Sequence, residues 1–226
     1  MPGRCVIITA HMEGRILENV KPEKGDVFIC ADGGYLYAED EGIRPSAIIG
    51  DFDSIGKAPE FLDCSCSAGQ PLPEIVRLPA EKDDTDTLAC VKWGMAKGYR
   101  DFIIAGGLGG RFDHSYANVQ TLSYLIDHGC PTWIIDGGNS LTMIAGSEAA
   151  GEASIPLTPS PGRKFSIFSY DERCEGVSVS GAKYGLDNAV LTQSFPIGVS
   201  NEFITGEAAR VSVKKGKLLI MTSTGD

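Results

Sequence analysis

The chain has 226 residues, which is long enough for one large domain or two small ones. Its composition, 42% hydrophobic and 22% charged residues, is that of a soluble globular protein. Its formal net charge of -10 argues against non-specific binding to nucleic acid or to an anionic membrane, because a polyanion would be repelled. A small anionic ligand would need a metal ion or a local cluster of basic side chains.

The sequence predicts a cytoplasmic protein. No uncharged apolar stretch approaches the ~18 residues of a membrane span, and the apolar run after Arg4 is too short for the core of a signal peptide. Seven scattered cysteines favour a reduced set of mostly buried thiols. Cys64 and Cys66 form a CxC with no second Cys or His pair nearby, which disfavours a zinc site.

The first part of the chain alternates short apolar runs with a helical pattern. Strands are expected at 4–10, 26–31 and 47–49, and a helix at 35–41. This alternation predicts a mostly parallel sheet covered by helices on both faces. Ligands bind beyond the carboxyl ends of the strands in such sheets, and Asp32-Gly33-Gly34 stands at one of those ends. The same three residues are also common in ordinary turns.

The most informative stretch is IIGDFDSI, residues 48–55, in which an apolar run ends at Gly50 and is followed by Asp51 and Asp53. In an extended backbone, residues two apart project from one face, so both carboxylates would face one point. Carboxylates suit Mg2+, which takes oxygen ligands and shares them with phosphate. Taken alone, this DxD is more typical of a surface turn whose Asp side chains bind nearby backbone amides.

A second acidic stretch, EKDDTD at 81–86, follows a short strand expected at 75–79 and opens a helix that is expected to reach about Lys97. Leu88, Val91 and Met95 give this helix an apolar stripe. Capping can explain Asp83 and Asp86, with an N-cap Asp and an acidic residue in the first turn. Four acids in six residues repel one another, however, and a cation would relieve that repulsion.

A glycine-rich loop, residues 106–110, follows a strand expected at 101–105 and precedes a helix to about His128. Glycines let backbone amides approach a ligand closely, a helix N-terminus favours an anion, and Arg111 adds a guanidinium fork for phosphate oxygens. The loop is not a Walker A motif, because no Gly-Lys-Ser/Thr ends it. His114 also fits a histidine that simply begins a helix.

After a strand at 133–136 the character of the sequence changes. Residues 146–163 are rich in Pro, Gly, Ser and Ala, and short β-rich segments separated by turn residues follow, at 164–170, 174–180, 189–195, 208–213 and 217–222. We therefore expect an α/β domain over residues 1–140, with a mostly parallel sheet flanked by helices, and an all-β sandwich domain over residues 141–226.

The ordered set of motifs resembles the thiamine pyrophosphokinase (thiamine diphosphokinase) family. The matching pieces span nearly the whole chain: ADGG at 31–34, IIGDFDSI at 48–55, KDDTD at 82–86, GGRFDH at 109–114, GAKYGL at 181–186 and SNE at 200–202. The ordered combination is specific, although no single piece is. The chain has Gly185 where the family usually has Pro, and residues 56–74 match no family motif.

The resemblance implies transfer of the pyrophosphate of ATP to the hydroxyl of thiamine, giving thiamine diphosphate and AMP, with Mg2+ as cofactor. It also implies that residues 1–140 bind nucleotide and metal, that residues 141–226 bind thiamine, and that the chain forms a homodimer with active sites between subunits. Carried over by position, it implies catalytic acids Asp51, Asp53, Asp83 and Asp86, of which the first three hold the metal; nucleotide contacts from Asp32, Gly33, Gly34, Gly109, Gly110, Arg111, Asp113 and His114; and thiamine contacts from Ser200 and Asn201.

Two other functions use the same residues. A metal-dependent phosphohydrolase acting on a nucleotide would need the same acids, with water as the acceptor. A non-catalytic nucleotide or thiamine sensor would bind the same ligands, but it has no need to gather four carboxylates around a phosphate.

Overall fold

The computed structural model describes residues 3–52, 72–79, 81, 83–160 and 162–224. Asp53 and the Cys64/Cys66 pair lie outside the described residues, so the predictions for them stay predictions. The chain divides into two compact units, one formed by Met1–Thr121 with Gly129–Gly137 and the other by Leu122–His128 with Gly138–Asp226.

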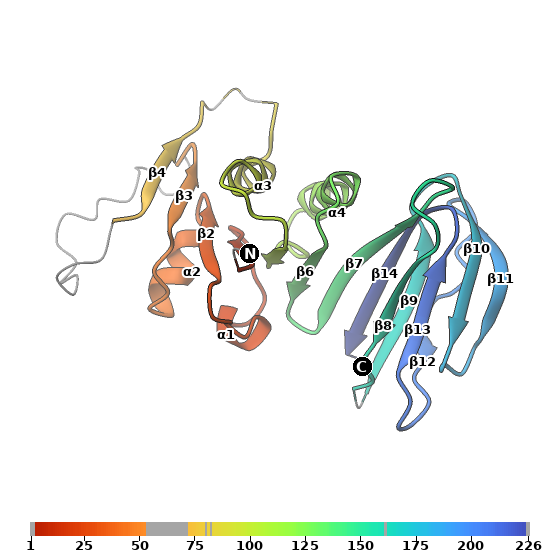
Figure 1. The fold of residues 1–226 in the computed structure, drawn as a ribbon. Coiled ribbons are helices and arrows are strands. Elements are labelled where there is room, and N and C mark those ends of the chain that lie inside the picture. The colour runs from red at the N-terminus through yellow and green to blue at the C-terminus, as the bar shows by residue number, and fades with distance from the viewer. Residues whose placement is uncertain (1–2, 53–71, 80, 82, 161, 225–226) are drawn as a thin grey trace. The chain divides into compact units, whose positions relative to one another are not determined.

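The first unit is built on parallel strands in the spatial order β6-β5-β1-β2-β3-β4. Every residue of β1, β3 and β5 is buried, which explains why these strands read as continuous apolar runs rather than as alternating ones. Figure 1 labels β2, β3, β4 and β6 of this set. The bounds of the six strands are β1 Cys5–Ile8, β2 Val27–Ala31, β3 Ala47–Gly50, β4 Glu74–Arg77, β5 Phe102–Ala105 and β6 Thr132–Asp136.

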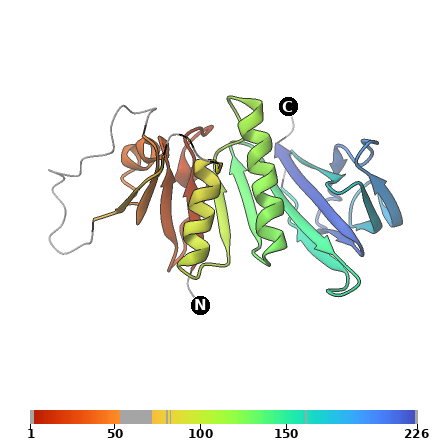
Figure 2. The same ribbon diagram turned by 90° about the horizontal axis from the view of Figure 1, so that it is seen from above.

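Helices cover both faces of this sheet. Val6 and Ile8 of β1 belong to a buried cluster with Ala38 of α2 (Gly34–Asp40). The alternate residue Cys5 lies against Gly94 of α3 (Asp86–Ala96), on the opposite face (Figure 2). A short α1 (Ile16–Asn19), which the sequence did not predict, and α4 (Phe112–Asp127) complete the set of described helices. Each of them is too short or too polar to cross a lipid bilayer.

The predicted face of α3 needs a correction. Its buried side chains are Thr87, Cys90 and Val91 together with Gly94, whereas Leu88 and Met95 of the predicted stripe are only half-buried. Small residues face the sheet because the helix lies close to it: a Cβ at Gly94 would lie 2.8 Å from a ring atom of Phe102. The apolar stripe therefore marks the edge of the buried face rather than its centre.

Apart from Leu122–His128, which contains the C-terminal end of α4, the second unit consists of β-strands, in agreement with the predicted all-β C-terminal domain. Antiparallel strands follow one another in the order β12-β9-β14-β7, and a four-stranded antiparallel sheet has the order β11-β10-β13-β8. Three of the strands were not predicted, namely β7 (Asn139–Gly146), β8 (Ala153–Leu157) and β12 (Asn201–Glu202). The remaining bounds are β9 Arg163–Ser169, β10 Arg173–Ser180, β11 Leu186–Thr192, β13 Ala209–Val213 and β14 Gly216–Thr224.

The prediction of reduced, buried thiols is confirmed for the cysteines that the structure describes. Cys5, Cys30, Cys90, Cys130 and Cys174 are all free and buried. Burial raises the pKa of Cys5 to about 12, so this thiol stays protonated and unreactive at neutral pH.

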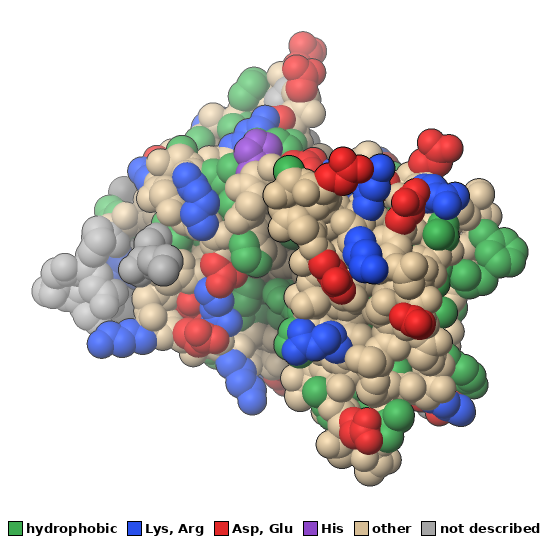
Figure 3. Space-filling view, turned by 45° about the vertical axis from the view of Figure 1, so that its right-hand side comes forward, with side chains coloured by type: hydrophobic (Ala, Val, Ile, Leu, Met, Phe, Trp, Pro, Cys, Tyr) green, Lys and Arg blue, Asp and Glu red, His purple; other side chains and the backbone are tan. Residues whose placement is uncertain are grey.

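On the face shown in Figure 3, acidic and basic side chains are interspersed rather than gathered into a continuous basic patch.

Candidate functional site

A cleft of about 690 Å³ lies at the carboxyl ends of the parallel strands in the first unit. Three of the predicted acids line it, Asp32 after β2, Asp51 after β3 and Asp86 at the start of α3. The glycine-rich loop after β5 lines it as well, through Gly107, Gly109 and Gly110, and so do Arg111, which follows the loop, and His114 in the first turn of α4 (Phe112–Asp127). The carboxyl ends of neighbouring parallel strands meet at one edge of a sheet, which is why motifs far apart in sequence come together here.

Asp32 is held rigidly at this edge. Its side chain is 7% exposed, and Oδ1 accepts a hydrogen bond of 3.1 Å from the backbone N–H of Phe52. Its own N–H donates to the carbonyl of Ile49 at 2.8 Å. Gly50 permits this contact, because a Cβ there would lie 2.8 Å from the Asp32 Cα. The turn after β2 is therefore hydrogen-bonded to Ile49 of β3 and to Phe52 just after it.

Phe52 anchors the chain next to Asp51. Its backbone φ is +64°, in the left-handed region, and its side chain is 2% exposed within the hydrophobic core. The extended backbone that we assumed for Asp51 to Asp53 is therefore wrong at Phe52. Burial of a phenyl ring offsets the cost of about 1–3 kcal/mol for a non-glycine residue in this region. The buried ring anchors the turn, and Asp51 lines the cleft.

The start of α3 also differs from the prediction. Thr85 is the N-cap, and its Oγ1 accepts a hydrogen bond of 3.2 Å from the N–H of Leu88, so no Asp caps this helix. Asp86 and its neighbours Thr85 and Thr87 line the cleft. Asp83 is exposed and is not among the lining residues, while Asp84 forms an ion pair of 2.6 Å with Lys92.

The glycine-rich loop is fixed by bonds to neighbouring segments. The N–H of Gly107 donates to the carbonyl of His11 at 2.8 Å, and the amide of Asn118 donates to the carbonyl of Gly107 at 2.9 Å. Asp136, at the end of β6 and 2% exposed, accepts hydrogen bonds from the N–H of Leu108 at 2.8 Å and from the N–H of Glu13 at 2.6 Å. One buried carboxylate thus ties together two loops that border the cleft.

Arg111 presents its guanidinium at the mouth of the cleft. It forms two hydrogen bonds with Asp113, of 2.6 Å from Nη2 and 3.2 Å from Nε, and both side chains are well exposed. These bonds lower the pKa of Asp113. Asp113 itself does not line the cleft, and its side chain instead binds the guanidinium of Arg111.

Two other predicted nucleotide residues, Gly33 and Gly34, do not line the cleft. Gly34 instead has a packing reason to be glycine. A Cβ at this position would lie 2.2 Å from the carbonyl oxygen of Ile8, so α2 can begin this close to β1 only without a side chain.

The donor set fits a hard cation that is shared with a phosphate. Mg2+ is usually bound by one or two carboxylates together with substrate phosphates, and Asp32, Asp51 and Asp86 offer carboxylate oxygens in one cleft. No group of three or more His, Cys, Asp or Glu side chains among the described residues is arranged to hold a metal ion by itself. The cleft therefore fits a metal that arrives with its ligand better than a closed structural site.

The predicted thiamine residues lie in the second unit. The side chain of Asn201 is 6% exposed, and both of its ends are bonded to the backbone of Tyr184: Oδ1 accepts from the N–H at 3.0 Å, and Nδ2 donates to the carbonyl at 2.8 Å. Asn201 borders a cavity of about 160 Å³ together with Tyr184. The N–H of Ser200 donates to Ser166 Oγ at 2.9 Å, and its φ is +58°. Asn201 therefore holds the Tyr184 loop in place.

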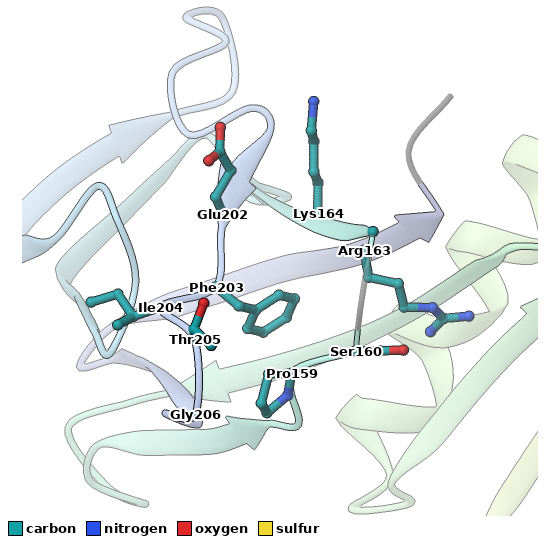
Figure 4. Close-up of a pocket in the computed structure, with 10 residues that line it drawn as sticks. Pro159, Ser160, Arg163, Lys164, Glu202, Phe203, Ile204, Thr205 and Gly206 are labelled. Atoms are coloured by element: carbon teal, nitrogen blue, oxygen red, sulfur yellow. The ribbon is translucent and has the colours of Figure 1, made fainter.

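A larger concavity of about 560 Å³, drawn in Figure 4, lies beside β12 and contains none of the predicted residues. Its aromatic element is Phe203. Arg163 points away from this ring, toward Thr222 Oγ1 at 3.3 Å, and Glu202 forms an ion pair of 2.9 Å with Lys183. Two of its charged groups are thus bound to neighbours within the unit, which distinguishes it from the acid-lined cleft.

Comparisons with known proteins identify the family. The family model described as "Thiamin pyrophosphokinase, catalytic domain" matches residues 21–134, half of the chain, and the model of the "vitamin B1 binding domain" matches residues 152–218. The chain belongs to the thiamine pyrophosphokinase family. The enzyme is therefore an ATP-dependent diphosphotransferase of the thiamine pyrophosphokinase type.

Individual thiamine pyrophosphokinases agree with this assignment. The chain is 29% identical over 198 residues to the thiamine pyrophosphokinase of Bacillus subtilis, covering 88% of this chain and 87% of the relative. It is 26% identical to thiamin pyrophosphokinase 1 of Caenorhabditis elegans, covering 79% and 69%. The crystal structure of the Bacillus subtilis enzyme matches the fold with a TM-score of 0.76 and 27% identity, covering 98% of this chain and 99% of that chain.

Two residues of this site were not predicted from the sequence. His11 lines the cleft three residues after β1 ends. Asp136, which ends β6 just before Gly137 and Gly138, does not line the cleft but holds two loops that border it. Both stand at the carboxyl end of a parallel strand. The rule that pointed to Asp32 and Asp51 would have found them if it had been applied to every strand rather than only to strands followed by a recognisable motif.

Proposed function

We propose that ATP binds in the cleft of the first unit with Mg2+, and that its pyrophosphate is transferred there to the hydroxyl of thiamine, giving thiamine diphosphate and AMP. The observation that carries this proposal is the meeting of three acids and the glycine-rich loop in one cleft of a thiamine pyrophosphokinase family member. The acids suit a cation, and the loop and Arg111 suit phosphate oxygens.

The reaction forms a bond between the thiamine hydroxyl oxygen and the β-phosphorus of ATP, and it breaks the bond from that phosphorus to the oxygen bridging to the α-phosphorus. AMP leaves, and a carboxylate of the cleft takes the hydroxyl proton. Such transfers depend mainly on holding the reactants in line and on neutralising charge. Mg2+, when bound, supplies positive charge to the phosphate oxygens.

We assign the metal to Asp51 together with the phosphates of ATP, since Asp51 lines the cleft on the turn that Phe52 anchors. Asp32 and Asp86 line the same cleft and complete its acidic side. Catalytic and metal-binding roles for Asp53 and Asp83 stay predictions from the family motif, because Asp53 lies outside the described residues and Asp83 is not a lining residue.

The assignment of thiamine to the domain 141–226 stays a proposal too. It is supported by the match of residues 152–218 to the family's vitamin B1 binding domain. Within it, Ser200 and Asn201 are the predicted thiamine residues, and the bonds of Asn201 to Tyr184 indicate that it acts by shaping the loop around the ligand. We also infer a cytoplasmic enzyme, in keeping with its free buried thiols.

The test is incubation of the purified protein with ATP, Mg2+ and thiamine, followed by separation of the nucleotides and the thiamine esters. Transfer predicts AMP and thiamine diphosphate in equal amounts, and no AMP when thiamine is left out. AMP that forms equally well without thiamine would favour a phosphohydrolase. Binding of both ligands without any product would favour a sensor.

We further propose the homodimer, with active sites between subunits, that the family resemblance implies. Sedimentation velocity at micromolar concentration, combined with an activity assay on the same sample, tests it. A dimer is expected throughout the active concentration range, and a fully active monomer would refute a shared site.

A further inference from the structure

The cleft contains a histidine that belongs to none of the family motifs. His11 follows β1, and its carbonyl oxygen accepts two hydrogen bonds of 2.8 Å, one from the N–H of Gly107 and one from Thr9 Oγ1. Its backbone is therefore fixed to the glycine-rich loop. The side chain is exposed and lines the cleft that also holds Asp51 and Arg111.

The imidazole ring lies on the backbone of the glycine-rich loop. A Cβ at Gly109 would lie 2.3 Å from His11 Nε2 and 2.9 Å from Cδ2, and a Cβ at Gly110 would lie 3.3 Å from Nδ1. Gly110 also has a positive φ of +69°, but Gly109 is not in the left-handed region, so backbone conformation does not explain that glycine. The ring of His11 occupies the space in which a side chain at Gly109 would stand.

The polar groups around the ring leave it available to a ligand. Among the residues that the structure describes, neither ring nitrogen of His11 takes part in a hydrogen bond, whereas Arg111 is already bound twice by Asp113. The N–H groups of Gly109 and Gly110 also have no partner within the described part of the chain. The imidazole of His11 thus lies in the cleft against two residues of the glycine-rich loop whose N–H groups are not used within the described chain.

We propose that His11 donates a hydrogen bond to a phosphate oxygen of the nucleotide that the glycine-rich loop holds, and so determines the affinity of this enzyme for ATP. The inference rests on the proposed function, since it takes the cleft to be the nucleotide site. His11 acts in binding, and no proton transfer to or from the reacting atoms is assigned to it.

Two substitutions separate hydrogen bonding from packing. His11→Phe keeps a ring against Gly109 and Gly110 but removes both nitrogens, whereas His11→Gln keeps an N–H donor and loses the ring. The matched control is His128→Phe, which makes the same change at an exposed histidine just beyond the end of α4. Both histidines are exposed, so all three variants should unfold within about 0.5 kcal/mol of wild type, and this is measured first. The control also removes the hydrogen bond of 2.7 Å between His128 Nδ1 and the carbonyl of Tyr124, so its own stability is measured separately.

The readout is the Kd for ATP with Mg2+ and without thiamine, by isothermal titration calorimetry, together with separate KM values for ATP and thiamine. His11→Phe should weaken ATP binding about tenfold, the change expected for one lost hydrogen bond to a charged group, with the KM for thiamine within about twofold of wild type. His11→Gln should bind ATP more tightly than His11→Phe, and His128→Phe should match wild type.

A wild-type Kd for His11→Phe would overturn the proposal and leave the ring a packing role only. Equal affinities of the Phe and Gln variants would overturn the hydrogen bond as well. Because binding is measured without thiamine, the result stands apart from the transfer reaction. A wild-type protein that binds ATP but forms no thiamine diphosphate would refute the proposed function and not the role of His11.

Discussion

Asp136 offers the sharpest test of how the cleft is built. Its carboxylate is 2% exposed and accepts the N–H groups of Glu13 at 2.6 Å and Leu108 at 2.8 Å, from the loops after β1 and β5. Asp136→Asn keeps the shape of the side chain, but its amide nitrogen cannot accept a hydrogen bond. One of the two N–H groups would then face a donor.

The magnitude follows from these two bonds. Loss of one hydrogen bond to a charged group costs about 1.5–3 kcal/mol, and a buried N–H left facing a donor adds roughly 1 kcal/mol or more. We therefore expect the free energy of unfolding to fall by about 3 kcal/mol, which lowers the urea midpoint by about 1.5 M at a typical m value of roughly 2 kcal/mol/M. ATP binding should weaken too, because both loops border the cleft.

Tryptophan fluorescence during urea unfolding reports on the correct unit, because both tryptophans of the chain, Trp93 in α3 and Trp133 in β6, belong to the first unit. The matched control is Asp40→Asn at the exposed end of α2, expected within about 0.5 kcal/mol of wild type. If Asp136→Asn unfolds at the same urea concentration as this control, the carboxylate does not hold the two loops together.

Three further predictions follow from contacts in the first unit. Asp51→Asn should lower turnover by orders of magnitude with an unchanged urea midpoint, and wild-type turnover would count heavily against Asp51 as a metal ligand. Gly50→Ala should destabilise the first unit by about 1–3 kcal/mol and weaken ATP binding, because the added Cβ would lie 2.9 Å from Asp32 Oδ1. An unchanged melting temperature together with an unchanged Kd for ATP would refute this prediction. Burial acts to raise the pKa of Asp26, but hydrogen bonds from Arg4 outweigh it, so the pKa of Asp26 is lowered overall. The ionised carboxylate therefore stabilises the fold at pH values above its unfolded pKa of about 3.9, and this stabilisation is lost as the pH falls. The stability gap between wild type and Arg4→Met, from urea titrations, should therefore narrow between pH 7 and pH 3, and a constant gap would contradict the pairing.

Much of the cleft could be predicted from the order of its motifs. Continuous apolar runs identify β1, β3 and β5 as strands buried on both faces, and parallel strands bring their carboxyl ends to one edge. That topological fact places Asp32, Asp51 and the glycine-rich loop in one cleft without any knowledge of side-chain packing. The motifs likewise indicated the family that the comparisons identify.

The backbone conformation of single residues was harder to predict from the sequence, because short-range patterns do not reveal which residue has a left-handed backbone or caps a helix. The left-handed Phe52 is set by burial of its ring in the core, and the capping role of Thr85 by the exact start of α3. The short strand β12 was missed because it consists of Asn201 and Glu202 alone, too few residues to show a period.

The sequence by itself determined the fold class, the family and the strand ends at which ligand-binding residues gather, because these depend on residue type and periodicity along the chain. Only the tertiary structure decided which side chains hold the site together. Glu13 and Asp136 are 123 residues apart, and the imidazole of His11 meets glycines about a hundred positions away. Such contacts leave no local period in the sequence, since they arise only when the packed sheet brings its loops into register.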